Sequence, residues 1–313
     1  MGRDYSKMVD EFLISYTEGS LKNSTGILAD DIMVNYSNLG KFKGKAQVME
    51  ALRLPDDYDV KTVTTSNRME YSDHGNYYVA LVAHHLLSFE KYNEMFPLLF
   101  GGKYVFTISE SRQLITSVSF VLEYQAENTV YVKDFWEFAD GFNDYNALSG
   151  FDLLRFLKQS NLESDKTIVA AQLSKLFFWC LDTEAMDILE ALTTADFVIN
   201  RAKVVGSDKI VGNHDNLSAF IKEDKSHYDL SQYSVAIDGA RYISDTEVNV
   251  TAQHLTPHRP GNKKLNSLTK YHTFFDEDIE LTWIMEGEWL KLKAVTIKRA
   301  ADLAYYGYKI KNY

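Results

Sequence analysis

The chain carries one pattern of short motifs twice, and this repeat constrains its fold more than any other feature of the sequence. Five segments of the first half recur in the same order in the second half, each shifted by nearly the same amount in residue number. Self-similarity at a nearly constant period is typical of a duplicated structural unit. The matched segments are 30–36 with 195–201, 43–52 with 211–220, 58–60 with 228–230, 83–86 with 252–255, and Lys103-Tyr104 with Lys270-Tyr271.

Each copy predicts helices first and strands afterwards. Apolar residues at helical spacing open both copies, with Met8, Phe12 and Tyr16 in the first and Leu173 and Phe177 in the second. This order is typical of an α+β fold, with a curved antiparallel sheet packed on N-terminal helices. In the second copy the predicted strands are 233–238, 246–256, 270–277, 280–286 and 289–299, with acidic turns at 276–278 and 286–288.

The length of 313 residues fits two domains of roughly 150 residues each. We expect the first copy at residues 1–135, a partly helical connector at 136–163 and the second copy at 164–313. The connector is expected to be packed, because residues 152–157 have a helical pattern.

The charge balance restricts the partners. Lys and Arg number 33 against 44 Asp and Glu, which gives a net charge of −11 and argues against a nucleic-acid partner. No apolar stretch approaches the ~18 residues of a membrane helix, and the N-terminus lacks a signal core, so we expect a cytoplasmic protein without a membrane partner. The single Cys180 excludes an internal disulfide and a cysteine metal cluster, and its apolar surroundings predict a buried thiol.

Short motifs of the second copy carry a family resemblance. Residues 180–189 read as a helix end with an Asp and then a short helix, and residues 194–199 continue with a D-x-V type strand. The segment GEWLKL at 287–292 reads as the final strand pair. This arrangement resembles the nuclear-transport-factor-2-like superfamily, and within it the SnoaL-like and scytalone-dehydratase-like branch. The resemblance covers about residues 165–310 and, more weakly, residues 5–135.

The resemblance implies two cone-shaped domains, each with a pocket at one end. Dehydratases of this branch use an Asp on the first helix, two histidines and tyrosines, without a metal or another cofactor. By position, Asp182 matches the helix Asp and His258 matches one pocket histidine. The second histidine has no clear match, since Tyr233 lies near that position, and Arg201 replaces a pocket tyrosine that the first copy retains as Tyr36.

Members of this superfamily commonly pair their sheets as dimers. The resemblance therefore implies an intramolecular pseudo-dimer of the two copies, and it leaves a further homo-oligomer open.

Asp182 is the candidate general base. A carboxylate at the end of an otherwise apolar helix is expected to be desolvated inside a cone, which raises its pKa toward the range that general bases use. The alternative is structural, because Asp182 precedes Thr183 and Glu184 and its oxygen could cap the next helix.

His254 and His258 are the candidate proton-transfer groups of the second copy. They are four residues apart, so both can face the same side of a strand. A structural role for either histidine is the alternative. In the first copy, the repeat alignment turns His85 inward, and its neighbour His84 must face the opposite side, which excludes a metal pair.

Further aromatic residues complete the predicted ligand pockets. Trp179, Trp283 and Trp289 are assigned to the core, with Trp283 alternatively a pocket wall. No motif for a metal or a cofactor is present, so none is expected. The predicted pocket residues are Trp179, Arg201, Tyr233, Tyr271 and Trp283 in the second copy, and Tyr16, Tyr36 and His85 in the first.

Two hypotheses about function follow. In the first, the second copy is a cofactor-free lyase or isomerase, a dehydratase or cyclase for example, acting on a small cyclic or polyketide-like compound. In the second, both copies bind a small hydrophobic ligand or a protein partner without chemistry. Geometry discriminates between them, because the first requires Asp182 and a histidine within about one bridging water.

Overall fold

The computed structural model describes the backbone of residues 4–17, 25–53, 58–89, 98–125, 143–200, 210–212, 217–219, 221, 228–231, 234–260, 273–304 and 310–312. Side chains are described at 4–15, 25–53, 64–85, 101–123, 143–200, 217–219, 221, 234–253 and 277–298. The chain divides into two units, Met1–Phe151 and Asp152–Tyr313. This division falls inside the connector that the sequence predicts at 136–163.

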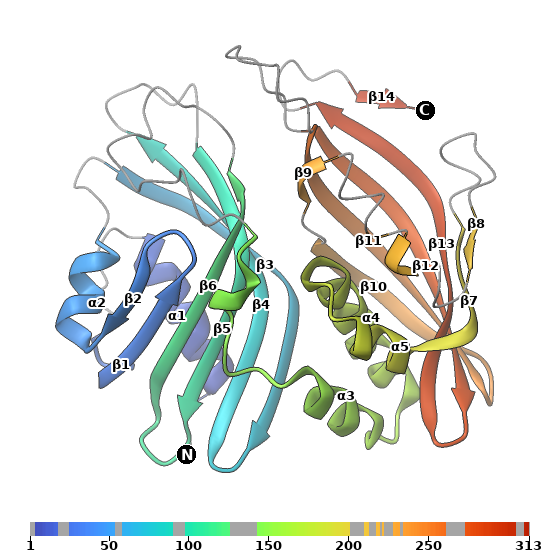
Figure 1. Ribbon diagram of the computed structural model, residues 1–313, viewed down its shortest axis with the longest axis horizontal. Coiled ribbons are helices and arrows are strands. Elements are labelled where there is room, and N and C mark those ends of the chain that lie inside the picture. Colours follow the sequence, from blue (N-terminus) through green and yellow to red (C-terminus); the bar gives the residue numbers. More distant parts are fainter. Residues whose placement is uncertain are drawn as a thin grey trace. The chain divides into compact units, whose positions relative to one another are not determined.

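The first unit places one long helix against a curved sheet (Figure 1). Its sheet has the strand order β2-β1-β6-β5-β4-β3, in which β1 runs parallel to β6 and the other neighbours are antiparallel. The elements are α1 (Tyr5–Thr17), β1 (Leu28–Tyr36), β2 (Gly40–Lys43), α2 (Lys45–Ala51), β3 (Tyr58–Asp73), β4 (Asn76–Phe89), β5 (Leu98–Ser109), β6 (Leu114–Gln125) and the short 3-10 helix η4 (Tyr145–Ala147).

The second unit repeats this arrangement. Its sheet has the order β10-β11-β12-β13-β7-β8, with β7 parallel to β13, and it curves around α4 and α5 (Figure 1). The elements are α3 (Leu153–Asn161), α4 (Lys166–Thr183), α5 (Met186–Leu192), β7 (Thr193–Asn200), β8 (Ile210–Gly212), β9 (Tyr228–Ser231), β10 (Ser234–Ser244), β11 (Glu247–Pro260), β12 (Thr273–Glu286), β13 (Trp289–Ala304) and β14 (Ile310–Asn312).

Burial follows the register of the repeat, in which segment 30–36 matches 195–201. In this register the first residue of β1 matches the first residue of β7. Each strand has two buried residues, then two exposed ones, then buried positions at alternate residues. The helices agree as well, because the buried positions Met8, Val9, Phe12, Leu13 and Ser15 of α1 correspond to Leu173, Ser174, Phe177, Phe178 and Cys180 of α4, all of them buried. The predicted pair of α+β units is therefore confirmed.

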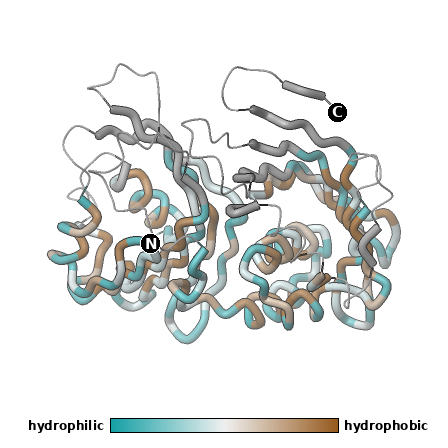
Figure 2. Tube along the Cα trace, turned by 45° about the horizontal axis from the view of Figure 1, so that its top comes forward, coloured by the Kyte–Doolittle hydropathy of each residue, from teal (hydrophilic) through white to brown (hydrophobic). Residues whose placement is uncertain are grey.

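Apolar side chains of the helices and of the inner sheet faces form the core of each unit. Along the tube in Figure 2, hydrophobic and hydrophilic positions alternate in the strands, as expected where one face of a sheet is buried. In the second unit, Trp283 is fully buried and its indole Nε1 donates a hydrogen bond to Ser174 Oγ at 3.1 Å, which joins β12 to α4. Cys180 is a buried free thiol, as predicted.

One predicted turn is wrong and another is confirmed. Strand β12 runs without interruption from Thr273 to Glu286, so residues 276–278 lie inside a strand and do not form an acidic turn. Side chains alternate between the two faces of a strand, so at most every second residue of a charged run points to the core face. The turn at 286–288 is present, where Gly287 has a φ of 67° between Glu286 and Trp289, which pair across the hairpin.

A short segment covers the outer face of the first sheet. Residues 143–151 follow this face, where the Asn35 Nδ2 group donates to the Ala147 carbonyl at 2.7 Å. Beneath the segment, Lys103 and Glu123 are both fully buried, with Nζ and Oε1 2.7 Å apart. The Tyr145 hydroxyl donates to the same Glu123 oxygen at 2.7 Å, so a buried ion pair is tied to the segment that covers it.

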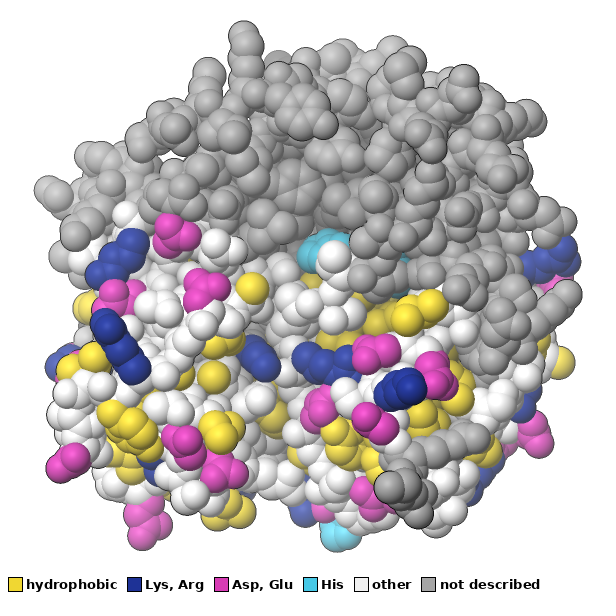
Figure 3. Space-filling view, turned by 180° about the vertical axis from the view of Figure 1, so that it is seen from behind, with side chains coloured by type: hydrophobic (Ala, Val, Ile, Leu, Met, Phe, Trp, Pro, Cys, Tyr) yellow, Lys and Arg dark blue, Asp and Glu magenta, His cyan; other side chains and the backbone are white. Residues whose placement is uncertain are grey.

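The described surface mixes both signs of charge. Acidic and basic side chains lie intermixed over the part of the face drawn in Figure 3. None of the described helices has the length and apolar character that crossing a membrane requires.

Candidate functional site

Asp182 lies in the last turn of α4 and is only 1% exposed. Phe178 and Trp179 precede it by four and three residues, so both rings lie on the same side of the helix one turn earlier. Both rings are buried as well. Asp182 thus directly follows the buried apolar run 176–181, which is the apolar environment that the sequence predicted for it.

The end of α4 and the start of α5 lie next to Asp182 in the chain. Helix α4 continues through Thr183, and Glu184 ends it in the left-handed conformation, with a φ of 54°. The N-cap position of α5 is held by Ala185, three residues beyond Asp182. Asp182 therefore does not hold the N-cap position of α5, and the choice between a base and a structural carboxylate stays a prediction.

The backbone of both candidate histidines belongs to β11. His254 pairs with Val235 on β10 and with Glu277 on β12, and His258 pairs with Thr273. The side chains of His254 and His258 lie outside the described residues, as do Arg201, Tyr233 and the whole of Tyr271. Their roles stay predictions.

The tryptophans divide into two groups. Trp179 and Trp283 are 2% and 0% exposed, so both are core residues. Trp289 is 36% exposed, and its assignment to the core is wrong. It directly follows the β12–β13 turn, at the end of the hairpin, where few neighbouring residues can cover a large ring.

In the first unit, Tyr36 and His85 meet around Tyr104. All three are at most 1% exposed. His85 Nε2 and the Tyr104 hydroxyl oxygen are 3.1 Å apart, within hydrogen-bond distance, and the ring of Tyr36 meets that of Tyr104 edge-on at 6.2 Å between centroids. The ring of Phe120 closes the cluster at 4.4 Å from Tyr104 and 5.0 Å from Tyr36.

Burial sets the protonation of this cluster. Burial, with a smaller contribution from the neighbouring His84, lowers the pKa of His85 to about 3, so its imidazole is neutral at physiological pH. Burial also raises the pKa of Tyr36, whose hydroxyl therefore stays protonated. A neutral imidazole beside phenol groups can exchange hydrogen bonds with a ligand, but it is a weak base for proton abstraction.

We expect the first unit to lose stability as the pH falls from about 6.5 toward about 3. In this window the unfolded chain takes up a proton at His85 that the folded unit refuses, which costs up to about 1.4 kcal/mol per pH unit. Urea unfolding at a series of pH values gives the free energy of unfolding of wild type and of His85→Gln. The difference between the two isolates the contribution of His85, because both proteins have the same carboxylates. A difference that does not change with pH would contradict the buried neutral imidazole.

The sequence did not single out Tyr104, which holds the cluster together. A signal was available, because Lys103-Tyr104 matches Lys270-Tyr271 in the repeat, and Tyr271 was predicted to line the pocket of the second copy. Tyr16, also predicted as a pocket residue, lies in α1 with its side chain outside the described part. Among the residues that the structure describes, no three His, Cys, Asp or Glu side chains are grouped to hold a metal ion.

No family model and no curated protein matches the chain. Several solved structures are similar to it, each over half of the chain or less. A protein assigned as a scytalone dehydratase from Novosphingobium aromaticivorans is 16% identical, with a TM-score of 0.36, and the match covers 50% of this chain and 91% of that protein. A hexachlorocyclohexane dehydrochlorinase, LinA type 3 from Novosphingobium barchaimii, is 10% identical, with a TM-score of 0.38 and coverages of 49% and 98%.

A domain of unknown function with a cystatin-like fold from Nostoc punctiforme is also similar, at 8% identity, a TM-score of 0.33 and coverages of 43% and 78%. At such low identity the likeness concerns the fold alone.

Proposed function

We propose that the second unit is a cofactor-free lyase or isomerase that acts on a small cyclic or polyketide-like compound. The observation that supports this proposal is the burial of Asp182 in the last turn of α4, directly after the buried apolar run 176–181.

In the proposed reaction Asp182 is the base. Its carboxylate takes a proton from the carbon next to a carbonyl of the compound, and the electron pair of that C–H bond moves toward the carbonyl oxygen. His254 or His258 stabilises this oxygen by donating a hydrogen bond. An isomerase then returns the proton to another carbon. A dehydratase instead returns it to a departing hydroxyl group, which leaves as water.

The first unit fits the second hypothesis, binding without chemistry. Thr17 stands where the repeat places Asp182 in the second unit, so the base is missing. The observation that favours a binding role is the Tyr36, His85 and Tyr104 cluster, since it offers neutral hydrogen-bonding groups in an aromatic interior.

The test is a thermal-shift screen of cyclic ketones and phenols against the full chain, followed by NMR of each stabilising compound to detect conversion. Asp182→Asn keeps the shape of the side chain and removes the base. We expect this variant to bind the compounds and to convert them at least about 100-fold more slowly, the usual scale of general-base catalysis.

Glu190→Gln is the matched control, because Glu190 is an exposed carboxylate of α5 whose loss should leave conversion unchanged. Conversion by Asp182→Asn at the wild-type rate, or stabilising compounds that are never converted, would overturn the enzymatic proposal. Persistent binding without conversion would establish the binding hypothesis in its place.

A further inference from the structure

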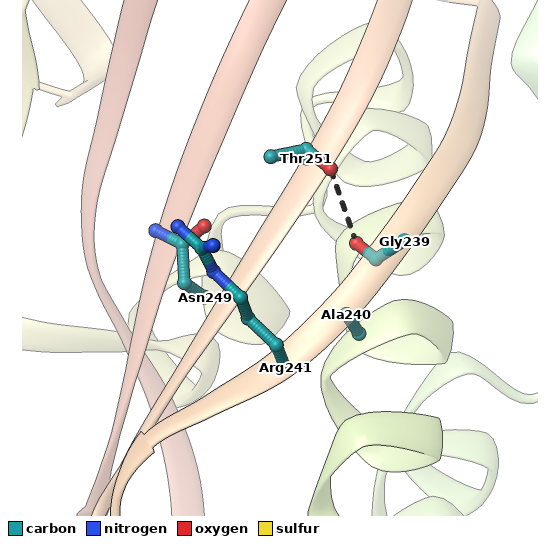
Figure 4. Close-up of a pocket in the computed structure, with 5 residues that line it drawn as sticks. All are labelled: Gly239, Ala240, Arg241, Asn249 and Thr251. Carbon is teal, nitrogen blue, oxygen red and sulfur yellow. Dashed lines mark hydrogen bonds between the residues drawn. The ribbon is translucent and has the colours of Figure 1, made fainter.

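A small cavity lies on the outer face of the second sheet, away from the interior site. It measures about 230 Å³ and is lined by Gly239, Ala240 and Arg241 of β10 and by Asn249 and Thr251 of β11 (Figure 4). Val248 and Val250 of β11 are buried in the core. Because neighbouring residues of a strand face opposite sides, Asn249 and Thr251 face away from that core.

Arg241 and Asn249 are directly opposite each other on adjacent strands, and their side chains extend to the same side in Figure 4. Gly239 is opposite Thr251, beside a register shift of β10, and it leaves the space that a side chain would occupy. The Thr251 hydroxyl donates only a long hydrogen bond, 3.5 Å, to the Gly239 carbonyl.

Asn249 carries an acceptor that the protein leaves unused. The residue is 4% exposed, and its Nδ2 group donates to Glu280 Oε1 at 2.7 Å. Its Oδ1 atom is buried and has no hydrogen-bond partner among the residues that the structure describes. A buried acceptor without a donor costs about 1–3 kcal/mol, so a ligand with an N–H or O–H group at this point regains that energy.

The charges around the cavity favour an anion. Lys298 Nζ is 2.7 Å from Glu280 Oε2, and this ammonium holds the pKa of Glu280 below its usual range. Glu280 is therefore ionised and paired with Lys298. The exposed guanidinium of Arg241, whose charge also helps to lower the pKa of Glu280, is a second positive group, so two cations face one carboxylate at the cavity wall. Its fork geometry suits a carboxylate.

We propose that this cavity binds a small carboxylate with a hydroxyl or amino group on the neighbouring carbon. The carboxylate pairs with Arg241, and the hydroxyl or amino group donates to Asn249 Oδ1. The volume is below the ~300–1,000 Å³ of drug-sized pockets, which limits the ligand to a small molecule. This binding site is separate from the interior site around Asp182 and does not depend on the proposed reaction.

The experiment is a calorimetric or NMR titration of the full chain with lactate and mandelate. Propionate and phenylacetate are the matched probes that lack the hydroxyl group. We expect saturable binding of the hydroxy acids, and about tenfold weaker binding of the acids without the hydroxyl, because the Asn249 acceptor then stays unpaired.

Three variants and one control locate the binding. Arg241→Gln is expected to weaken the binding of the hydroxy acids about tenfold or more. Asn249→Leu is expected to remove the preference for the hydroxy acids over the matched acids that lack the hydroxyl. Gly239→Leu is expected to abolish binding by filling the cavity, since a Cβ there meets nothing closer than Thr251 Oγ1 at 3.8 Å and the fold can accept it. Lys291→Gln is the control, because Lys291 is ion-paired with Glu286 at the β12–β13 hairpin. This variant should bind the hydroxy acids as wild type does.

Asn249 is buried, so Asn249→Leu could disturb the fold. Arg241 is exposed and Gly239 has space for a side chain, so their variants test the proposal independently of Asn249→Leu. Binding that Gly239→Leu and Arg241→Gln leave unchanged would overturn the proposal. The absence of saturable binding of either hydroxy acid at millimolar concentration would overturn it as well.

Discussion

Replacing Lys103 with Met, or Glu123 with Leu, is expected to lower the free energy of unfolding of the first unit by about 3–5 kcal/mol. Both side chains are fully buried, with Nζ and Oε1 2.7 Å apart. Removing one partner leaves the other charge in a medium that solvates it poorly, and this penalty exceeds the ordinary value of a hydrogen bond. Glu123 also accepts from Tyr145, so its loss additionally loosens segment 143–151.

The double variant Lys103→Met with Glu123→Leu separates this cause from a general loss of packing. It removes both charges at similar volume, so we expect it to be more stable than either single variant. Urea unfolding of wild type, the two single variants and the double variant measures the coupling energy between Lys103 and Glu123. Hydrogen exchange of peptides from each unit shows whether the loss of stability lies in the first unit. Single variants that lose less than about 1 kcal/mol, the range of exposed ion pairs, would show that water reaches the pair.

The second large effect is expected at Trp283. Trp283→Ala should lower the free energy of unfolding of the second unit by about 3–5 kcal/mol, because it leaves a large cavity between β12 and α4. It also removes the hydrogen bond from Nε1 to Ser174 Oγ. Hydrogen exchange should speed up in peptides of α4 and β12, while peptides of the first unit keep their wild-type rates.

Trp289→Ala is the matched control for this substitution. The residue type and the deleted atoms are the same, but Trp289 is 36% exposed, so the loss should be well below that of Trp283→Ala. Equal losses at the two positions would contradict the assignment of Trp283 to the core and of Trp289 to the surface.

The repeat made most of the fold predictable from the sequence. The register read from short matches such as 30–36 with 195–201 is also the register in which the buried positions of α1 correspond to those of α4. A duplicated unit conserves the burial pattern of its core more readily than its residue types, because packing selects for apolar character and size. Asp182 was singled out differently, from the family resemblance and as a carboxylate at the end of an otherwise apolar helix.

Contacts between distant residues were not predictable. The Lys103 and Glu123 pair joins neighbouring strands, and neither residue stands out in its own segment. The acidic run at 276–278 was predicted as a turn, since the sequence does not show that both neighbouring strands continue past it. The unused acceptor of Asn249 depends on where its two amide atoms point, which only coordinates specify.

The facing of the two sheets as an intramolecular pseudo-dimer stays a prediction. Small-angle scattering of the full chain measures it, since facing sheets would give a single compact particle. A profile of two separated lobes would contradict it.

The central claim is that the second copy kept a functional carboxylate where the first has Thr17. A crystal structure of the full chain with the most stabilising compound of the ketone and phenol screen tests it most directly. We predict density for the compound inside the second unit, with a reacting atom about 2.6–3.2 Å from an Asp182 oxygen or one bridging water away. Density for the compound only elsewhere on the chain, with the surroundings of Asp182 closed by protein side chains, would contradict the claim.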